Sequence, residues 1–188
     1  MRVKLGTKDT AGASVGRAVD GKAGVRLGGV FEIECRAPDG RLKWRDRAHN
    51  LVTNVGLQHI LDVVFSGGTA VATWYMGLIN DTPTLAAADT AASHAGWTEF
   101  TAYDEAVRQE YVETRSSQTE SNAASKAVFT ISTNGSVIAG AFLASLSTKS
   151  GATGTLLCEV AFTGGDKSAD DGDTLSVTYT FAGADDGA

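Results

Sequence analysis

The feature of this sequence that most restricts its fold is a single stretch with helical hydropathy periodicity. In most of the remaining chain, apolar and polar residues alternate as they do in β-strands. Within Trp44–Phe65, apolar residues recur at the spacing that lines one face of an α-helix, and these are Leu57, Ile60, Leu61, Val64 and Phe65. Thr53 stands where a helix N-cap belongs, because its hydroxyl can accept from the first free backbone amides. Ser66-Gly67-Gly68 follows the stripe, and glycine ends helices because it adopts positive φ without steric cost. We therefore expect one short amphipathic helix that caps a β-structure, with its stripe buried and with His59 and Asp62 facing outward.

Strand patterns account for most of the remaining chain, beginning with a β-hairpin. Val30–Arg36 alternates apolar and charged residues, and Arg41–Arg47 returns as a less regular partner. Pro38-Asp39-Gly40 lies between them and supplies turn chemistry, because proline presets φ and glycine accepts a positive φ.

A second hairpin is predicted around Asn134-Gly135, a dipeptide that favours tight hairpin turns. Its strands would be Lys126–Ser132 and Ser136–Ser147. The other strands are expected within 71–79, 96–106, 108–121, 155–163 and 174–181, with a polar surface loop at 80–95. Roughly eight or nine short strands at these spacings predict a mainly β protein, an antiparallel β-sandwich or jelly roll with one helix.

The stretch Gly96–Ala106 carries aromatic residues on both faces of its expected strand. Trp97 and Tyr103 share one face, and Phe100 lies on the other. Such a strand suits a sheet edge or an interface, so Trp97 is a candidate partner-binding residue.

Residues 1–27 differ from the body and are interpreted as an extended basic N-terminal arm on a β-sandwich domain at 28–188. From Gly6 onward the arm has no regular hydropathy period, so it cannot offset its own ordering entropy. Its formal charge is +4, and its basic residues, all candidate partner contacts, are Arg2, Lys4, Lys8, Arg17, Lys22 and Arg26. Because the whole chain carries −6, residues 28–188 carry −10. The arm is either a solvated tail or a segment ordered by an acidic protein surface; nucleic acid is disfavoured, since the arm has no aromatic residue for stacking.

The cysteines and the apolar content indicate which broad class of protein this is. Cys35 and Cys158 lie far apart in apolar runs, which favours reduced, buried side chains over a disulfide or a metal site. No apolar run approaches the ~20 residues of a membrane helix, and the N-terminus lacks the apolar core of a signal peptide. With 43% hydrophobic and 20% charged residues, the chain has the composition of a soluble globular protein. We expect no membrane partner.

No residue pattern predicts catalysis or a cofactor. None of the three histidines, His49, His59 and His94, stands in a metal or nucleophile motif. The stretch Asp166–Asp173 has four carboxylates around a glycine, but its spacing differs from that of an EF-hand. Turn geometry explains these residues equally well, so cation binding by this stretch is left open.

Several runs together resemble a family of small structural proteins from tailed bacteriophages. They extend over about residues 30–182 and include LKWRDRAHNLVTNVGLQHILDVVF, WYMGLI, ASHAGWTEFTAYDEAVR, SNAASKAVFTIS and STKSGATGTLLCEVAFTGGDKSADDGDTLSVTYTF. The resemblance implies a virion component assembled in the host cytoplasm, most like a head decoration (cement) protein. Its implied partners are the major capsid protein or other virion proteins, and it implies no catalytic residues. The arm lies outside the resemblance, so its role depends on the charge argument.

We therefore expect a non-enzymatic structural protein, without a cofactor, that binds the capsid surface as a homo-oligomer through shape, backbone pairing and the arm. The alternative is a head-fibre, tail or receptor-binding component that recognises a host-surface ligand. That alternative would need exposed aromatic residues, for which Trp97 is the candidate.

Overall fold

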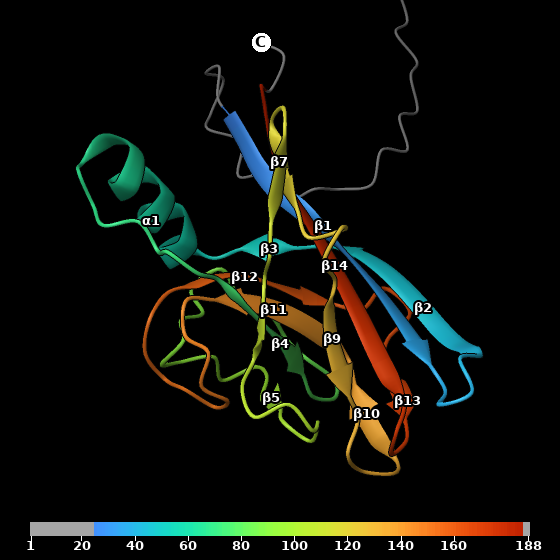
Figure 1. The fold of residues 1–188 in the computed structure, drawn as a ribbon. Coiled ribbons are helices and arrows are strands. Elements are labelled where there is room, and N and C mark those ends of the chain that lie inside the picture. The colour runs from blue at the N-terminus through green and yellow to red at the C-terminus, as the bar shows by residue number, and fades with distance from the viewer. Residues whose placement is uncertain (1–24, 186–188) are drawn as a thin grey trace, which may run out of the picture.

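The computed structural model describes residues 25–185, which form two antiparallel β-sheets packed as a sandwich with one helix beside them (Figure 1). The first large sheet contains β1 (Val25–Arg36), β2 (Leu42–His49), β7 (Thr114–Ser116), β8 (Thr119–Ser121), β9 (Ala127–Thr130) and β14 (Thr174–Asp185). The second contains β3 (Leu51–Val52), β4 (Tyr75–Ile79), β5 (Glu99–Phe100), β6 (Gln109–Glu110), β11 (Gly140–Ala144) and β12 (Leu156–Ala161). A small third sheet pairs β10 (Ser136–Ile138) with β13 (Lys167–Ala169). The predicted β-sandwich is confirmed.

The core lies between the two large sheets. Phe31 and Tyr179 come from neighbouring strands of the first sheet, and their rings stack at 4.2 Å between centroids. Met76 and Leu143 face them from the second sheet and are fully or almost fully buried. Each such side chain contributes about 1.5–3 kcal/mol of apolar burial, so this layer is the main source of stability.

The first predicted hairpin is confirmed, but the predicted arm boundary is wrong. β1 pairs with β2 after a turn in which Gly40 has φ of 84°. On its other side β1 pairs with β14 continuously from Val25 opposite Asp185 to Arg36 opposite Thr174. Residues 25–27 therefore belong to a sheet, because β14 is long enough to supply their backbone partners.

The second predicted hairpin is wrong, although its turn is present. Gly135 has φ of 66°, yet β9 pairs with β14 and β10 pairs with β13. The expected return strand is divided at Ala139, whose backbone bonds to Ile79 and Phe162. This switch between sheets separates β10 from β11, so the segment after the turn leaves β9.

Helix α1 (Asn54–Phe65) has the predicted ends. The Thr53 hydroxyl accepts from the Gly56 amide at 3.0 Å, and Gly67, just past the helix, has φ of 70°. Thr53 itself is buried, and its hydroxyl also donates to the Leu156 carbonyl of β12. The start of the helix is therefore fixed to the second sheet.

The predicted buried face of α1 is confirmed only in part, because Ile60 packs against the core and Leu57 is half-buried but the rest of the stripe is exposed. Gly56 is the one buried residue of this helix, whereas Leu61, Val64 and Phe65 are 54%, 62% and 79% exposed. A Cβ atom at Gly56 would collide with the Leu157 carbonyl oxygen, so only glycine permits this close approach. The face toward the sandwich is therefore rotated by about 100°, one residue, from the predicted stripe.

Candidate functional site

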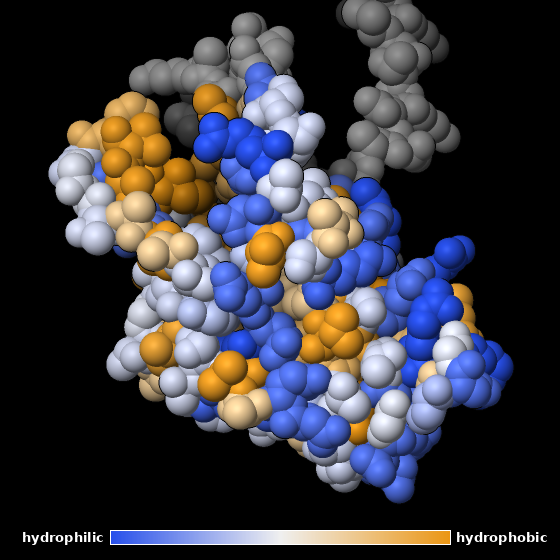
Figure 2. All heavy atoms as spheres, in the orientation of Figure 1, coloured by the Kyte–Doolittle hydropathy of each residue, from blue (hydrophilic) through white to orange (hydrophobic). Residues whose placement is uncertain are grey.

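Helix α1 stands out from the sandwich (Figure 1). It carries an exposed apolar stripe. The stripe is formed by Leu61, Val64 and Phe65, and Figure 2 shows apolar side chains gathered over this helix. Asp62 is exposed, as predicted, but His59 is half-buried and meets the Trp74 ring edge-on at 5.6 Å. Most of the apolar surface of α1 thus remains uncovered by the sandwich.

A mainly apolar groove of about 310 Å³ separates α1 from the neighbouring end of the sandwich. Its floor reaches the core at Leu143, Leu157 and Tyr179, which are buried. Its other lining residues are His59, Ile60, Val63, Val64, Ala70, Val71, Trp74, Tyr111, Glu113, Glu120 and Phe181. We call this opening the α1 groove.

The charged side chains that line the α1 groove are acidic. Glu120 pairs with Arg115 at 2.9 Å, across the β7–β8 hairpin. Glu113 is exposed and makes no salt bridge within residues 25–185. The groove therefore combines an apolar floor with one rim carboxylate, Glu113, that no cation neutralises within residues 25–185.

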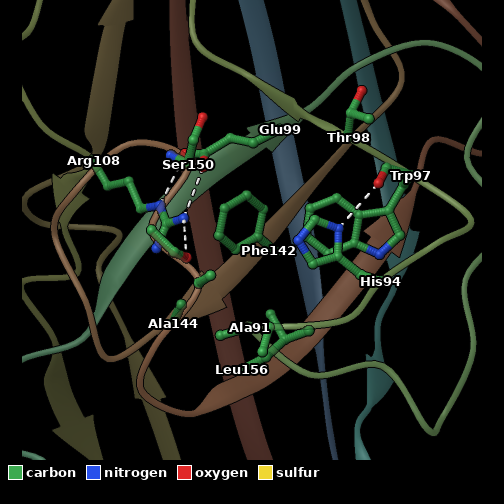
Figure 3. A pocket seen from close by; sticks show the side chains of 13 residues that line it. Ala91, His94, Trp97, Thr98, Glu99, Arg108, Phe142, Ala144, Ser150 and Leu156 are labelled. Atoms are coloured by element: carbon green, nitrogen blue, oxygen red, sulfur yellow. Dashed lines mark hydrogen bonds and ion pairs between the residues drawn. The ribbon is translucent and has the colours of Figure 1, made fainter.

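A second hollow, of about 270 Å³, has the Arg108–Glu99 ion pair in its wall (Figure 3). Arg108 donates two hydrogen bonds to Glu99, at 2.9 and 2.7 Å, and both side chains are 4% exposed. Arg108 also donates to the Leu146 carbonyl at 2.9 Å and lies 4.9 Å from the centre of the Phe142 ring. This ion pair joins β5 to the loop after β11, so its evident role is structural.

Trp97, the predicted partner-binding aromatic residue, is buried at 6% exposure, so that prediction is wrong. Its ring stacks on His94 at 3.9 Å and packs on Phe142 at 5.1 Å. Its indole N–H donates to Glu159 at 2.8 Å and to Asp89 at 3.2 Å. The expected strand is also shorter than predicted, because only Glu99–Phe100 pairs as β5 while the loop at 80–95 supplies partners for Trp97.

Glu159 and Asp89 form a buried carboxylate pair beneath this loop. Burial, together with the negative charge of Asp89, raises the pKa of Glu159 to about 8. The Ala86 amide donates to both carboxylates, at 3.1 Å each, so the pair holds the loop on β12. The one feature of the sequence that could have indicated this buried carboxylate is the single glutamate in the apolar run LLCEV.

The acidic stretch Asp166–Asp173 is organised by protein contacts. Lys43 binds Asp173 at 2.5 Å and Asp170 at 2.9 Å, and Asp173 also accepts from the Asp170 amide. Asp166 accepts from the Thr82 backbone and hydroxyl. Within residues 25–185, no three histidine, cysteine or acidic side chains are grouped as a metal site would require.

Both cysteines are free and buried, as predicted. Burial raises the pKa of Cys35 to about 11 and that of Cys158 to about 12. Both thiols are therefore protonated at neutral pH, which disfavours reactivity.

Of the predicted arm contacts, Arg26 is exposed on β1, opposite Ala184. Arg2, Lys4, Lys8, Arg17 and Lys22 lie outside the described residues. The exposed stripe of α1 was missed as a contact surface, because its apolar periodicity indicated burial.

No protein-family model and no curated protein matches the chain. Among the described residues, no helix is long and apolar enough to cross a membrane.

Proposed function

We propose that this protein is a non-enzymatic virion structural protein of a tailed phage that attaches to the capsid surface as a decoration, or cement, protein. The sequence runs within residues 30–182 supply the phage assignment. The observation that carries the mode of attachment is the exposed stripe Leu61, Val64 and Phe65 on a helix held firmly at its base.

Such a stripe suits a protein partner. Three large apolar side chains on one helix face are the anchors of helix-in-groove recognition. Burying them yields about 25 cal/mol per Å² of apolar surface, and an aromatic residue such as Phe65 often dominates such a contact. Thr53 and Gly56 fix the helix to β12, so little orientational freedom is lost on binding.

The basic arm supplies the second contact. Arg17, Lys22 and Arg26 face an acidic surface of a neighbouring subunit, which favours an oligomeric array of copies on the particle. Attachment that involves these charges weakens with rising salt. The alternative of a receptor-binding fibre or tail component loses its main sequence support with the burial of Trp97.

The experiment adds purified protein to particles of the encoding phage assembled with this gene deleted. Co-sedimentation is compared for the wild type, for Val64→Ser/Phe65→Ser and for Val128→Ser, an exposed valine on β9. We expect hundreds of copies per head for the wild type and the control. The double variant should bind about 10–100-fold more weakly, a loss of about 1.4–2.8 kcal/mol.

Two outcomes would contradict the proposal. Absence of wild-type binding would exclude the virion role, and a handful of copies confined to the tail would favour the alternative. Equal binding of the double variant would show that α1 is not the attachment surface.

A further inference from the structure

We propose that the segment Met1–Leu5 of the same chain docks in the α1 groove. The inference goes beyond attachment to a particle, since it concerns the isolated protein. It follows from the groove, from the pattern of the first five residues, and from the length of chain between them.

The α1 groove presents a surface that water wets poorly. Leu143, Leu157 and Tyr179 belong to the buried core, yet they line an opening between α1 and the strands. Trp74 and Phe181, both half-buried, form its walls. Filling the groove with apolar side chains removes the remaining exposed surface of Trp74, Phe181 and Val64 from water, which is favourable in proportion to its area.

The segment Met1–Leu5 has the matching pattern. Met1, Val3 and Leu5 alternate with Arg2 and Lys4. In an extended backbone, alternate side chains point to opposite sides, so the three apolar residues face the floor together.

The charges of the segment complement the rim. In the docked segment, Arg2 and Lys4 point away from the floor, where the exposed Glu113 supplies negative charge and Glu120 is already paired with Arg115. Residues 6–24 offer Val15 and Val19 as their only large apolar side chains, four positions apart. The first five residues are therefore the part of the arm that fits the groove.

The connecting chain is long enough to reach the groove of its own copy. β1 begins at Val25, and Phe181 in the groove wall pairs with Gly29. Those four residues span about 13 Å, whereas residues 6–24 can extend over about 60 Å. A tethered segment has an effective concentration near the millimolar range, above that of separate molecules in a micromolar solution. The segment of the same chain therefore outcompetes that of a second copy.

Cysteine cross-linking in the full-length chain tests the proposal. The test pair is Leu5→Cys with Ala70→Cys, an exposed position on the groove. The matched control is Leu5→Cys with Val128→Cys, on the outer face of β9. Under mild oxidation at micromolar protein, we expect an intrachain disulfide to form at least tenfold faster in the test pair, measured by non-reducing peptide mass mapping.

A charge exchange then tests the rim contact. Glu113→Lys in the test pair should slow cross-linking several-fold, and adding Lys4→Glu should restore the rate, because the pair is again of opposite sign. Equal rates for test and control pairs would overturn the proposal, as would a dimer linked between chains, which assigns the groove to a second copy. No particle is present, so failure here is distinct from failure of capsid attachment.

Discussion

At the scale of single residues, two buried charged groups decide how the loops lie on the second sheet. Glu159 is fully buried beside Asp89, and Arg108 is buried beside Glu99. A buried charge is tolerated only when a proton or an opposite charge neutralises it. A proton neutralises Glu159 in the Glu159–Asp89 pair, and Arg108 and Glu99 neutralise each other.

The Glu159 pair predicts a pH dependence of stability. The folded-state pKa of about 8 lies above the ordinary 4.5, so the folded state binds the extra proton between these values. This contribution is complete below about pH 4.5 and is lost as pH rises through about 8, at no more than about 1.4 kcal/mol per pH unit. Urea unfolding from pH 5 to 9 should show it, and Glu159→Gln should flatten the slope. An unchanged slope in the variant would contradict the assignment.

The Arg108–Glu99 pair predicts a large and non-additive loss. Arg108→Met leaves the Glu99 carboxylate buried without its cation, which should cost about 3–5 kcal/mol. Adding Glu99→Gln to that variant should recover part of the loss, because the uncompensated charge is removed. Denaturant unfolding of the two single variants and the double variant measures the coupling. Additive losses would show that the two side chains act independently.

At the scale of elements, α1 shows that a helix can be anchored by its least hydrophobic residue. Gly56 lets the helix backbone approach Leu157 of β12, and the larger apolar residues point elsewhere. The anchored start and the free end explain how the helix is fixed while its stripe stays exposed.

If the apolar stripe were buried, Leu61→Ala would destabilise the protein more than Gly56→Ala. Because Gly56 makes the contact, we expect the reverse order of effects on the free energy of unfolding. Gly56→Ala should lower the free energy of unfolding by more than about 2 kcal/mol, although alanine is the better helix former by about 1 kcal/mol. Leu61→Ala should change it by no more than about 0.5 kcal/mol, whereas a buried leucine would cost about 2–5 kcal/mol. Thermal and urea unfolding of the two variants measure this, and the reverse order would show that the helix face is wrongly assigned.

At the scale of the whole molecule, β14 is the strand on which the first sheet depends. It pairs with β1, β8 and β9, and it carries Tyr179 into the centre of the core. Its partners lie far away in sequence, so the sandwich closes only when the two ends of the described chain meet.

Deleting residues 174–185 should therefore abolish the cooperative fold, because β1, β8 and β9 all lose a pairing partner. Deleting residues 1–24 should leave a cooperative thermal transition, since every described strand keeps its partners. Near-UV circular dichroism and calorimetry distinguish the two truncations. A cooperative transition in the first would mean that the second sheet and α1 fold alone.

Elements with local sequence signals could be predicted without the structure. The alternation in Val30–Arg36, the glycine turn after it and the Thr53 cap all depend on side chains within a few residues, and the structure confirms them. The burial of both cysteines was likewise predicted from the apolar residues next to them, and the structure confirms it. The virion role and the arm contacts remain predictions.

Which surface each element covers could not be predicted from local patterns. Hydropathy periodicity indicates that a helix has an apolar face. Glycine has no apolar side chain and does not contribute to this pattern, so the contact at Gly56 could not be predicted from it. Trp97 is buried against His94 and Phe142, with its indole N–H bonded to Asp89 and Glu159. Strand β9 joins β14 in place of the strand after its turn. Which residues pair and pack together depends on segments far apart in the sequence. These segments compete for the same positions in the sheets and the core, and a local sequence pattern carries no information about that competition.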